Sequence, residues 1–193
     1  MWRGLTTASD ALVLQGEGVR LRPPAPRDYE AWVALRSESA ASLQKYEPRW
    51  PADELTRFGF RRRLRSYQAE MKRGEGYAFL VFAGPEDVLV GGCNLSNVRR
   101  GSQLCATLGY WAGERHRNRG YITAAVKAIS SFCFGTLGLH RVQAACLPDN
   151  EPSKSVLRKA GFREEGLARS YLKVDGNWRD HLLFGLVEDD EGR

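Results

Sequence analysis

The sequence contains no long uninterrupted run of apolar residues, and no charged and then apolar leader follows Met1. A membrane-spanning helix and a secretory signal are therefore not expected, and we predict a cytoplasmic protein without membrane contact. Two phosphate-binding motifs are also missing, because there is no G-x-x-x-x-G-K-S/T and no G-x-G-x-x-G between a strand and a helix. Their absence excludes a P-loop and a dinucleotide-binding fingerprint.

Cysteine and histidine are scarce and widely spaced. The four cysteines include no C-x-x-C pair and have mostly apolar neighbours, which favours buried, reduced thiols over a disulfide framework. The three histidines are equally dispersed, so we predict no metal site. The residues concerned are Cys93, Cys105, Cys133, Cys146, His116, His140 and His181.

The chain has a surplus of basic side chains, with a formal net charge of +6 and a pI near 9.3 over 193 residues. This length predicts one domain, residues 1–193, with a substantial core. The basic surplus favours an acidic ligand: a phosphorylated cofactor, a nucleic acid or a ribonucleoprotein surface.

Residues 108–126 form the most informative stretch, an apolar run followed by a polar turn and then a helix. The apolar side chains after the turn recur three and four residues apart, as on an amphipathic helix. The turn therefore lies at a helix N-terminus, where unpaired N–H groups and the helix dipole favour an anion. Arg117, Arg119 and Gly120 would suit a pyrophosphate there. The alternative is a solvated charge run that only caps the helix.

The same patterns predict elements before and after this stretch. In the first half we expect a partly ordered lead-in over residues 1–18, an edge strand over 19–22, a helix that opens at Pro26, and a helix over 52–73. A proline-punctuated loop over 42–51 holds Tyr46 and Trp50, either as a lid on the core or exposed for a substrate.

In the second half, period-two patterns predict strands over residues 77–82, 88–97 and a third ending at Trp111. A central strand over 140–147 and a short helix that stops at Gly161 come next. The chain then ends in a hairpin of strands 163–174 and 178–187, followed by a frayed tail over 188–193.

The helix over residues 52–73 is rich in arginine. A solvated helix face explains such a run, and a patch for RNA or the ribosome is the alternative. The arginines are Arg57, Arg61, Arg62, Arg63 and Arg65.

Residues 117–122, Arg-Asn-Arg-Gly-Tyr-Ile, resemble the Q/R-x-x-G-x-G/A pyrophosphate loop of the GNAT superfamily of acetyl-coenzyme A-dependent N-acetyltransferases, with Ile122 in place of the usual Gly or Ala. Residues 148–162 are similar to that family's P-x-N-x-x-S block, with its Asn at Asn150 and its Ser at Ser153. Residues 171–181 and 94–102 resemble its RimJ-type branch, which acetylates the N-terminal alanine of ribosomal proteins.

The resemblance implies an α+β fold: a mixed, mostly antiparallel central sheet flanked by helices and splayed between the strands that end near Trp111 and Cys146. The pantetheine arm of acetyl-coenzyme A would lie in the splay and its pyrophosphate on the loop. The cofactor-binding residues that it implies are Trp111, Arg117, Asn118, Arg119, Gly120, Tyr121, Ile122, Thr123, Asn150 and Ser153.

The resemblance also suggests catalytic residues. An acidic residue before a glycine in the ribosomal branch corresponds to Glu165, which we expect as the base, with a surface carboxylate as the alternative. The family's usual tyrosine acid would fall at Leu157, which cannot donate a proton. Ser153, Asn150 or a water would have to protonate the thiolate, although Ser153 could instead cap a helix. Tyr171 is a weaker candidate.

Three functions follow as hypotheses. The leading one is transfer of an acetyl group to a protein N-terminus, that of a ribosomal protein. The acceptor could instead be a small amine such as an antibiotic or a polyamine. The third is a basic RNA- or ribosome-binding module with a degenerate cofactor site. The sequence leaves monomer and homodimer open.

Overall fold

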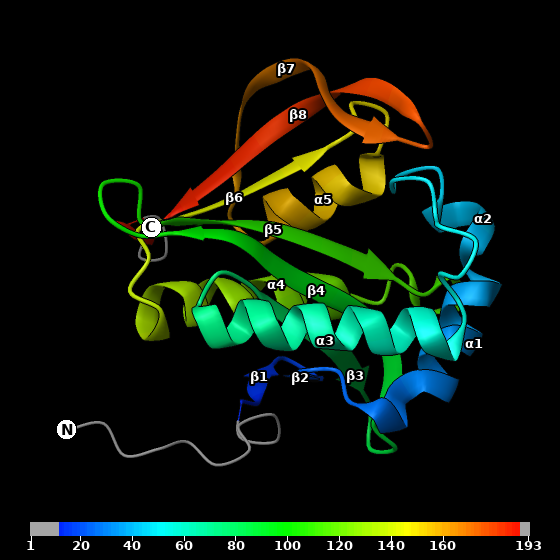
Figure 1. Ribbon diagram of the computed structural model, residues 1–193. Helices are drawn as coiled ribbons and strands as arrows, with labels where there is room; N and C mark the ends of the chain where they lie inside the picture. Colours follow the sequence, from blue (N-terminus) through cyan, green and yellow to red (C-terminus); the bar gives the residue numbers. More distant parts are fainter. Residues whose placement is uncertain (1–11, 190–193) are drawn as a thin grey trace.

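The computed structural model describes residues 12–189 and contains one sheet of eight strands in the order β1-β2-β3-β4-β5-β6-β8-β7 (Figure 1). All neighbours are antiparallel except β5 and β6. The strands are β1 Leu14–Gly16, β2 Val19–Arg22, β3 Tyr77–Ala83, β4 Val88–Arg99, β5 Cys105–Ala112, β6 Arg141–Cys146, β7 Arg163–Val174 and β8 Asn177–Val187.

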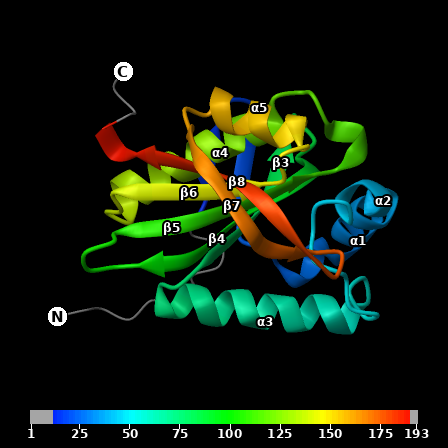
Figure 2. The same ribbon diagram turned by 90° about the horizontal axis from the view of Figure 1, so that it is seen from above.

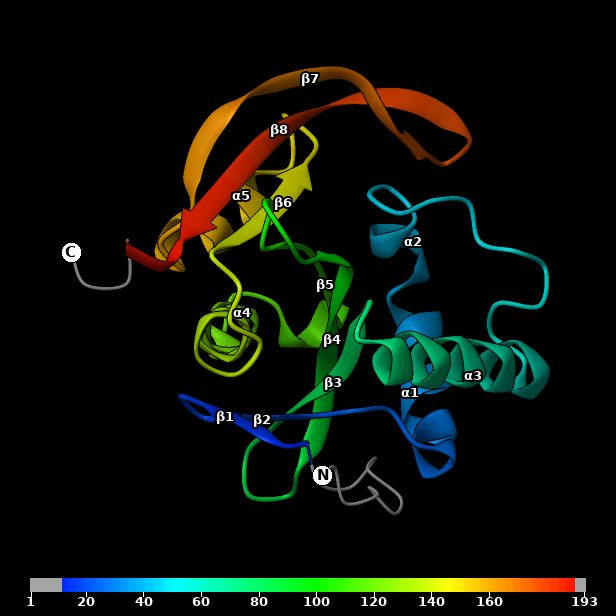
Figure 3. The ribbon, with the colours of Figure 1, turned by 60° about the vertical axis from the view of Figure 1, so that its left-hand side comes forward.

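Helices cover both faces of this sheet (Figures 2 and 3). On one face α4 and α5 pack over a large apolar core, and on the other face α1 and α3 enclose a smaller one. The α-helices are α1 Tyr29–Glu38, α2 Ala40–Leu43, α3 Arg57–Arg73, α4 Tyr121–Ser131 and α5 Glu151–Lys159. A π-helical turn, Phe132–Thr136, extends α4. The four cysteines are buried, as the sequence predicts.

The sheet opens between β5 and β6. The two strands pair only from Cys105 to Thr107 on β5, although β5 continues to Ala112 and β6 to Cys146. Beyond that point β6 keeps its pairing with β8, so its backbone stays ordered while its other edge is free of β5. The predicted α+β fold and its splay are confirmed, and the open end of the splay lies beside the turn that precedes α4.

The N-terminal part of the sheet differs from the prediction. Residues 19–22 are not an edge strand, because β2 pairs with β1 on one side and β3 on the other. The expected lead-in therefore contains a strand, which turns back through Gly18 in the left-handed region at φ 68°. Residues 1–11 of that lead-in and 190–193 of the expected tail lie outside the described residues.

Helix α3 begins at Arg57, five residues later than predicted. The Oγ1 atom of Thr56 accepts a hydrogen bond from the N–H of Gly59, which caps the helix there. The residues directly after Pro51 are compatible with a helix in the sequence, but the Thr56 cap makes α3 begin at Arg57.

Most of the arginine run on α3 forms ion pairs with nearby carboxylates. Arg57 pairs with Glu30, Arg62 with Asp53 and Arg63 with Glu54. Among residues 12–189 only Arg61 and Arg65 of this run have no such partner. The helix therefore uses much of its charge to hold the preceding segment and α1, and presents a smaller free basic surface than the sequence suggested.

Candidate active site

The turn between β5 and α4 is shaped as an anion site. Gly120 precedes the helix with φ 81°, a left-handed conformation that glycine adopts without a Cβ clash. The first hydrogen bond of the helix runs from the N–H of Ala124 to the carbonyl of Gly120. The N–H groups of residues 121–123 come before that bond, so they have no intrahelical acceptor and remain for a ligand.

Basic side chains surround these N–H groups. Arg117 makes an ion pair with Glu114 at 3.1 Å, whereas Arg119 has no carboxylate partner in the described part of the chain. The pKa of His116 is lowered by its partial burial and by the charges of Arg115 and Arg119. A cation is disfavoured at this position, and an anion is correspondingly favoured.

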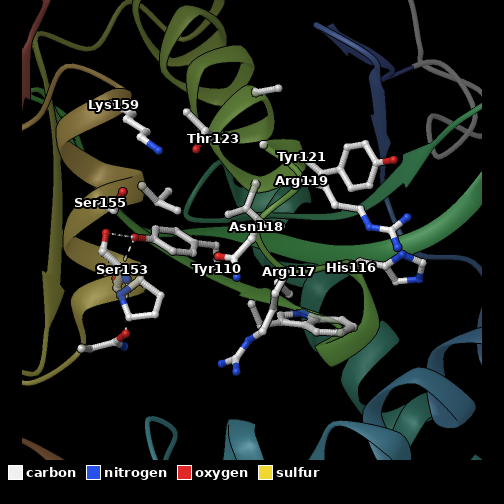
Figure 4. A pocket seen from close by; sticks show the side chains of 18 of the residues that line it. Tyr110, His116, Arg117, Asn118, Arg119, Tyr121, Thr123, Ser153, Ser155 and Lys159 are labelled. Atoms are coloured by element: carbon white, nitrogen blue, oxygen red, sulfur yellow. Dashed lines mark hydrogen bonds between the residues drawn. The ribbon is translucent and has the colours of Figure 1, made fainter.

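A cleft of about 770 Å³ runs from this turn along α4 and α5 to the open end of the splay. Its volume falls in the range of ligand pockets, about 300–1,000 Å³. Figure 4 shows the turn residues on one side of it, and Ser153, Ser155 and Lys159 of α5 on the other. Every residue predicted for cofactor binding lines this cleft: Trp111, Arg117, Asn118, Arg119, Gly120, Tyr121, Ile122, Thr123, Asn150 and Ser153.

A second cleft, of about 710 Å³, lies among α1, α3, the α2–α3 loop and the β7–β8 hairpin. In its wall the guanidinium of Arg36 pairs with Glu47 at 2.7 Å and stacks 4.4 Å from the ring centroid of Trp50. Trp50 also donates its indole N–H to Glu47, at 2.7 Å. Both loop aromatics, Tyr46 and Trp50, thus fold back onto this cleft instead of pointing into solvent.

The tip of the β7–β8 hairpin lies next to the α2–α3 loop (Figure 3), and both segments line the second cleft. The N–H of Asp175, in the hairpin turn, donates to the carbonyl of Glu47 at 3.1 Å. The side chains of Arg49 and Asp175 approach to 3.7 Å across the same gap. These contacts close one side of the cleft.

The two clefts meet at the open end of the splay, where six residues line both: Tyr46, Glu47, Tyr110, Trp111, Asn150 and Ser153. At this junction the hydroxyl groups of Tyr110 and Ser153 lie 2.7 Å apart (Figure 4). Burial raises the pKa of Tyr110, so its hydroxyl stays protonated. The cap of α5 is Asn150, whose Oδ1 accepts the N–H of Ser153, and not Ser153 itself.

Comparison with known proteins identifies the family. A model of the family described as "Acetyltransferase (GNAT) domain" matches residues 19–163.

The chain belongs to the GNAT acetyltransferase family.

Relatives of this GNAT chain cover most of its length. "Probable N-acetyltransferase YjcK" of Bacillus subtilis is 33% identical, over 93% of this chain and 99% of that protein. The ribosomal protein uS5-alanine N-acetyltransferase of Escherichia coli is 33% identical, over 84% and 85%. The solved structure of Mycobacterium smegmatis RimJ in complex with CoA-disulfide superposes with a TM-score of 0.87 at 33% identity, over 94% of this chain and 88% of that one.

Membership in the GNAT family makes the chain an acetyl-coenzyme A-dependent N-acetyltransferase, and the binding-module hypothesis is set aside. The two departures from the GNAT pattern have simple structural explanations. Ile122 is buried and packs in the core beneath α4, so its side chain does not block a ligand from its backbone N–H. Leu157 is fully buried in the same core, where an apolar side chain packs well.

Glu165 is not placed as the base expected in this GNAT site. It lines neither cleft and forms a two-pronged ion pair with Arg141, at the start of β6 and so at the closed end of the splay. The hydrogen bond from Arg141 lowers the pKa of Glu165, which makes its carboxylate a weaker base. The pairing of Glu165 with Arg141 could not be predicted from the sequence, because the two residues lie on different strands, β7 and β6.

The Glu165–Arg141 pair predicts a pH-dependent stability. Because the pKa of Glu165 is lower in the native state than in the unfolded chain, the pair stabilises the protein above the unfolded pKa, and this contribution is lost as the pH falls through the native pKa. Glu165→Gln should lower stability at pH 7 by no more than about 1 kcal/mol, because the pair is partly exposed.

The gap between the melting temperatures of wild type and Glu165→Gln should then shrink as the pH falls to about 3, below the ordinary carboxylate range. Thermal melts in a pH series measure it. A gap that stays constant over the series would mean that the carboxylate does not stabilise the fold through its charge.

Two site residues were missed at the level of sequence. Tyr110 lies within residues 108–126 but has no predicted role there, and His181 is considered only as one of three dispersed histidines. In the structure Tyr110 lies at the junction and His181 lines the second cleft. Tyr171, the weaker acid candidate, is 42% exposed on the hairpin.

Among residues 12–189 no group of three His, Cys, Asp or Glu side chains is arranged to hold a metal ion. None of the helices in that part of the chain combines the length and the apolar content that crossing a bilayer demands.

Proposed function

We propose that this enzyme acetylates the α-amino group at the N-terminus of a protein, with a cytoplasmic ribosomal protein as the acceptor. The observation that carries the proposal is the closure of the second cleft by the contacts between Asp175 and the α2–α3 loop. A chain end can thread into a cleft closed along one side, whereas a lysine within a folded surface would bring its neighbours against the loop and the hairpin. The name of the Escherichia coli relative supports the choice of a ribosomal protein.

In this proposal the first cleft holds acetyl-coenzyme A. The N–H groups at the start of α4 and the guanidinium of Arg119 would bind the pyrophosphate, and Arg117 adds positive charge beside it. When bound, acetyl-coenzyme A supplies an acetyl thioester that an amine can attack. The free β5 and β6 edges at the splay offer backbone groups to the arm that carries the thioester.

We assign the Tyr110 and Ser153 hydroxyls as the proton donors on the thiol side of the junction. They are within hydrogen-bond distance of each other and line both clefts. Because the raised pKa of Tyr110 keeps its proton in place, the pair can deliver a proton to a departing thiolate without a charged acid. Tyr110 thus takes the role that Leu157 cannot perform.

On the acceptor side, Arg61 and Arg65 have no carboxylate partner within residues 12–189 and can contact ribosomal RNA, whereas the other arginines of α3 are paired. This contact would help to bring a ribosomal acceptor to the second cleft. It is secondary to the reaction, which needs only the acceptor's terminal amine.

A matched set of peptides tests the acceptor class. One peptide has a free N-terminal alanine and one internal lysine, and its partner has the same sequence with the α-amino group already acetylated. We expect kcat/KM to be at least about 100-fold higher for the free peptide, with mass spectrometry placing the acetyl group on the N-terminus alone. Modification of the lysine, or faster acetylation of a polyamine or an aminoglycoside, would instead support the small-amine acceptor.

A further inference from the structure

His181 has one ring nitrogen engaged and one available. It lies on β8 and is 4% exposed, and its Nδ1 is 3.0 Å from the backbone carbonyl of Arg179. A carbonyl oxygen only accepts hydrogen bonds, so Nδ1 must carry the hydrogen. In the neutral ring Nε2 then holds a lone pair, and no residue of the described chain hydrogen-bonds to it.

That lone pair opens to the second cleft. Among residues 12–189 the only fully enclosed side-chain nitrogen or oxygen without a partner is Nε of Arg36, so Nε2 of His181 is not sealed in the core. His181 lines the second cleft together with Asn150 and Ser153 of the junction. Its neighbour Leu182 pairs with Cys146, which places His181 at the open end of the splay.

The imidazole is held in this orientation from two sides. The Arg179 carbonyl fixes Nδ1, and the ring of Tyr171 on β7 lies 5.9 Å away, centroid to centroid. From the surrounding elements Lys173 of β7 and Glu47 of the α2–α3 loop line the same cleft. A base pre-oriented by a backbone carbonyl loses little entropy when it accepts a proton.

We propose that His181 is the general base of the reaction, and that its Nε2 accepts the proton of the attacking amine. The inference builds on the proposed α-amino acceptor, although the same role would serve any amine entering the second cleft. An α-amino group has an ordinary pKa of about 7.7–8.0, so much of it is protonated at neutral pH and must lose a proton before it can attack.

The step balances in atoms and charge. The nitrogen lone pair forms the new C–N bond, and the C–S bond breaks with its electron pair going to sulfur. The acceptor ammonium loses two protons in all. One ends on the thiol through the Tyr110–Ser153 pair, and the other passes through Nε2 of His181 to water in the cleft. His181 on the acceptor side and the hydroxyl pair on the thiol side thus flank the reacting atoms.

Glu165 lies too far from His181 and the open end of the splay to act as the base in this proposal. The Glu165 carboxylate lies over Gly185, where an added Cβ would clash with its Oε1. Gly185 and His181 are four residues apart on β8, which is about 13 Å along a strand. The carboxylate is therefore too far from the open end of the splay to share the proton of the amine.

The decisive variant is His181→Gln, which keeps a polar side chain but has no basic nitrogen. With the peptide that wild type acetylates, or with whichever amine it prefers, we expect kcat to fall by about 100-fold or more. The KM of the acceptor and the melting shift produced by acetyl-coenzyme A should stay within about twofold, because ground-state binding is not altered. His140→Gln, an exposed histidine before β6, is the matched control and should leave kcat unchanged.

A second variant distinguishes loss of the base from misfolding. His181→Ala, checked by its melting temperature and its acetyl-coenzyme A shift, should regain activity in proportion to added imidazole. A purely structural histidine would not give this rescue.

Three results would overturn the assignment: a kcat for His181→Gln within about threefold of wild type, a folded His181→Ala that imidazole does not restore, or a 100-fold loss in Glu165→Gln instead. A failure of the proposed acceptor is distinguishable, because wild type itself would then leave the peptide unmodified.

Discussion

Gly120→Glu is expected to weaken binding of acetyl-coenzyme A strongly while the protein remains folded. Gly120 has φ 81°, and an L side chain in the left-handed region costs roughly 1–2 kcal/mol. The new carboxylate would also stand at the start of α4, where the pyrophosphate is proposed to bind, and like charges there would repel. Together these effects should raise the dissociation constant by at least about 100-fold.

The measurement is a thermal melt with and without acetyl-coenzyme A. At a concentration 100 times the dissociation constant, a ligand specific for the native state adds about 2.7 kcal/mol, which in a chain of this length is roughly 5–11 °C. We expect this shift in wild type and no more than about 0.4 kcal/mol, roughly 1–2 °C, in Gly120→Glu at the same concentration. Arg119→Ala should reduce it less, because the N–H groups of α4 remain.

Gly101→Glu is the matched control. Gly101 has φ 76° in the turn between β4 and β5, where an added Cβ would meet no atom within 4 Å, and that turn is at the closed end of the splay. The variant carries the same strain and the same charge, so it should keep the full shift. A shift retained in Gly120→Glu, or lost equally in both variants, would show that the turn before α4 does not hold the pyrophosphate.

The cofactor half of the site could be predicted from sequence because its determinants are local. The strand, the turn and the start of α4 are continuous in residues 108–126, and the conformation of Gly120 and the unpaired N–H groups follow from that order alone. The P-x-N-x-x-S block is local in the same way: Asn150 caps α5 and so brings Ser153 to the junction.

The acceptor half could not be predicted, because its contacts join residues far apart in the chain. The closure of the second cleft depends on Glu47 meeting Asp175. The ion pair that holds Glu165 away from both clefts depends on Arg141, which only the register of β6, β8 and β7 brings near. The proposed role of His181 depends on the second cleft, whose lining comes from segments spread from Pro24 to His181, and no spacing in the sequence encodes that.

The folded structure separates the two interpretations of the arginine run. On the sequence a solvated helix face is the favoured explanation of the run, and its clustering keeps a binding patch as the alternative. In the folded chain Arg57, Arg62 and Arg63 find Glu30, Asp53 and Glu54. Asp53 and Glu54 lie in the segment just before the helix, so these two pairs are local in the sequence. The fold still decides which arginine each carboxylate meets.

The proton donors give the last prediction. Tyr110→Phe removes the buried hydroxyl and keeps the ring, and Ser153→Ala removes its partner. If the two hydroxyls deliver one proton as a unit, each variant should lower kcat by about 100-fold, near the lower end for general acids because a thiolate leaves readily. The double variant should then be no slower than the slower single one, since both remove the same step.

Steady-state kinetics at saturating substrates measures this double-mutant cycle, and Tyr77→Phe is its control. Tyr77 lies on β3 with its ring edge against Phe132, 5.5 Å between centroids, so the change removes a tyrosine hydroxyl away from the junction and should leave kcat unchanged. Losses in Tyr110→Phe and Ser153→Ala that multiply would mean that the hydroxyls act in separate steps. Unchanged kcat in both would mean that water alone protonates the thiolate, and the junction would then select substrates without taking part in proton transfer.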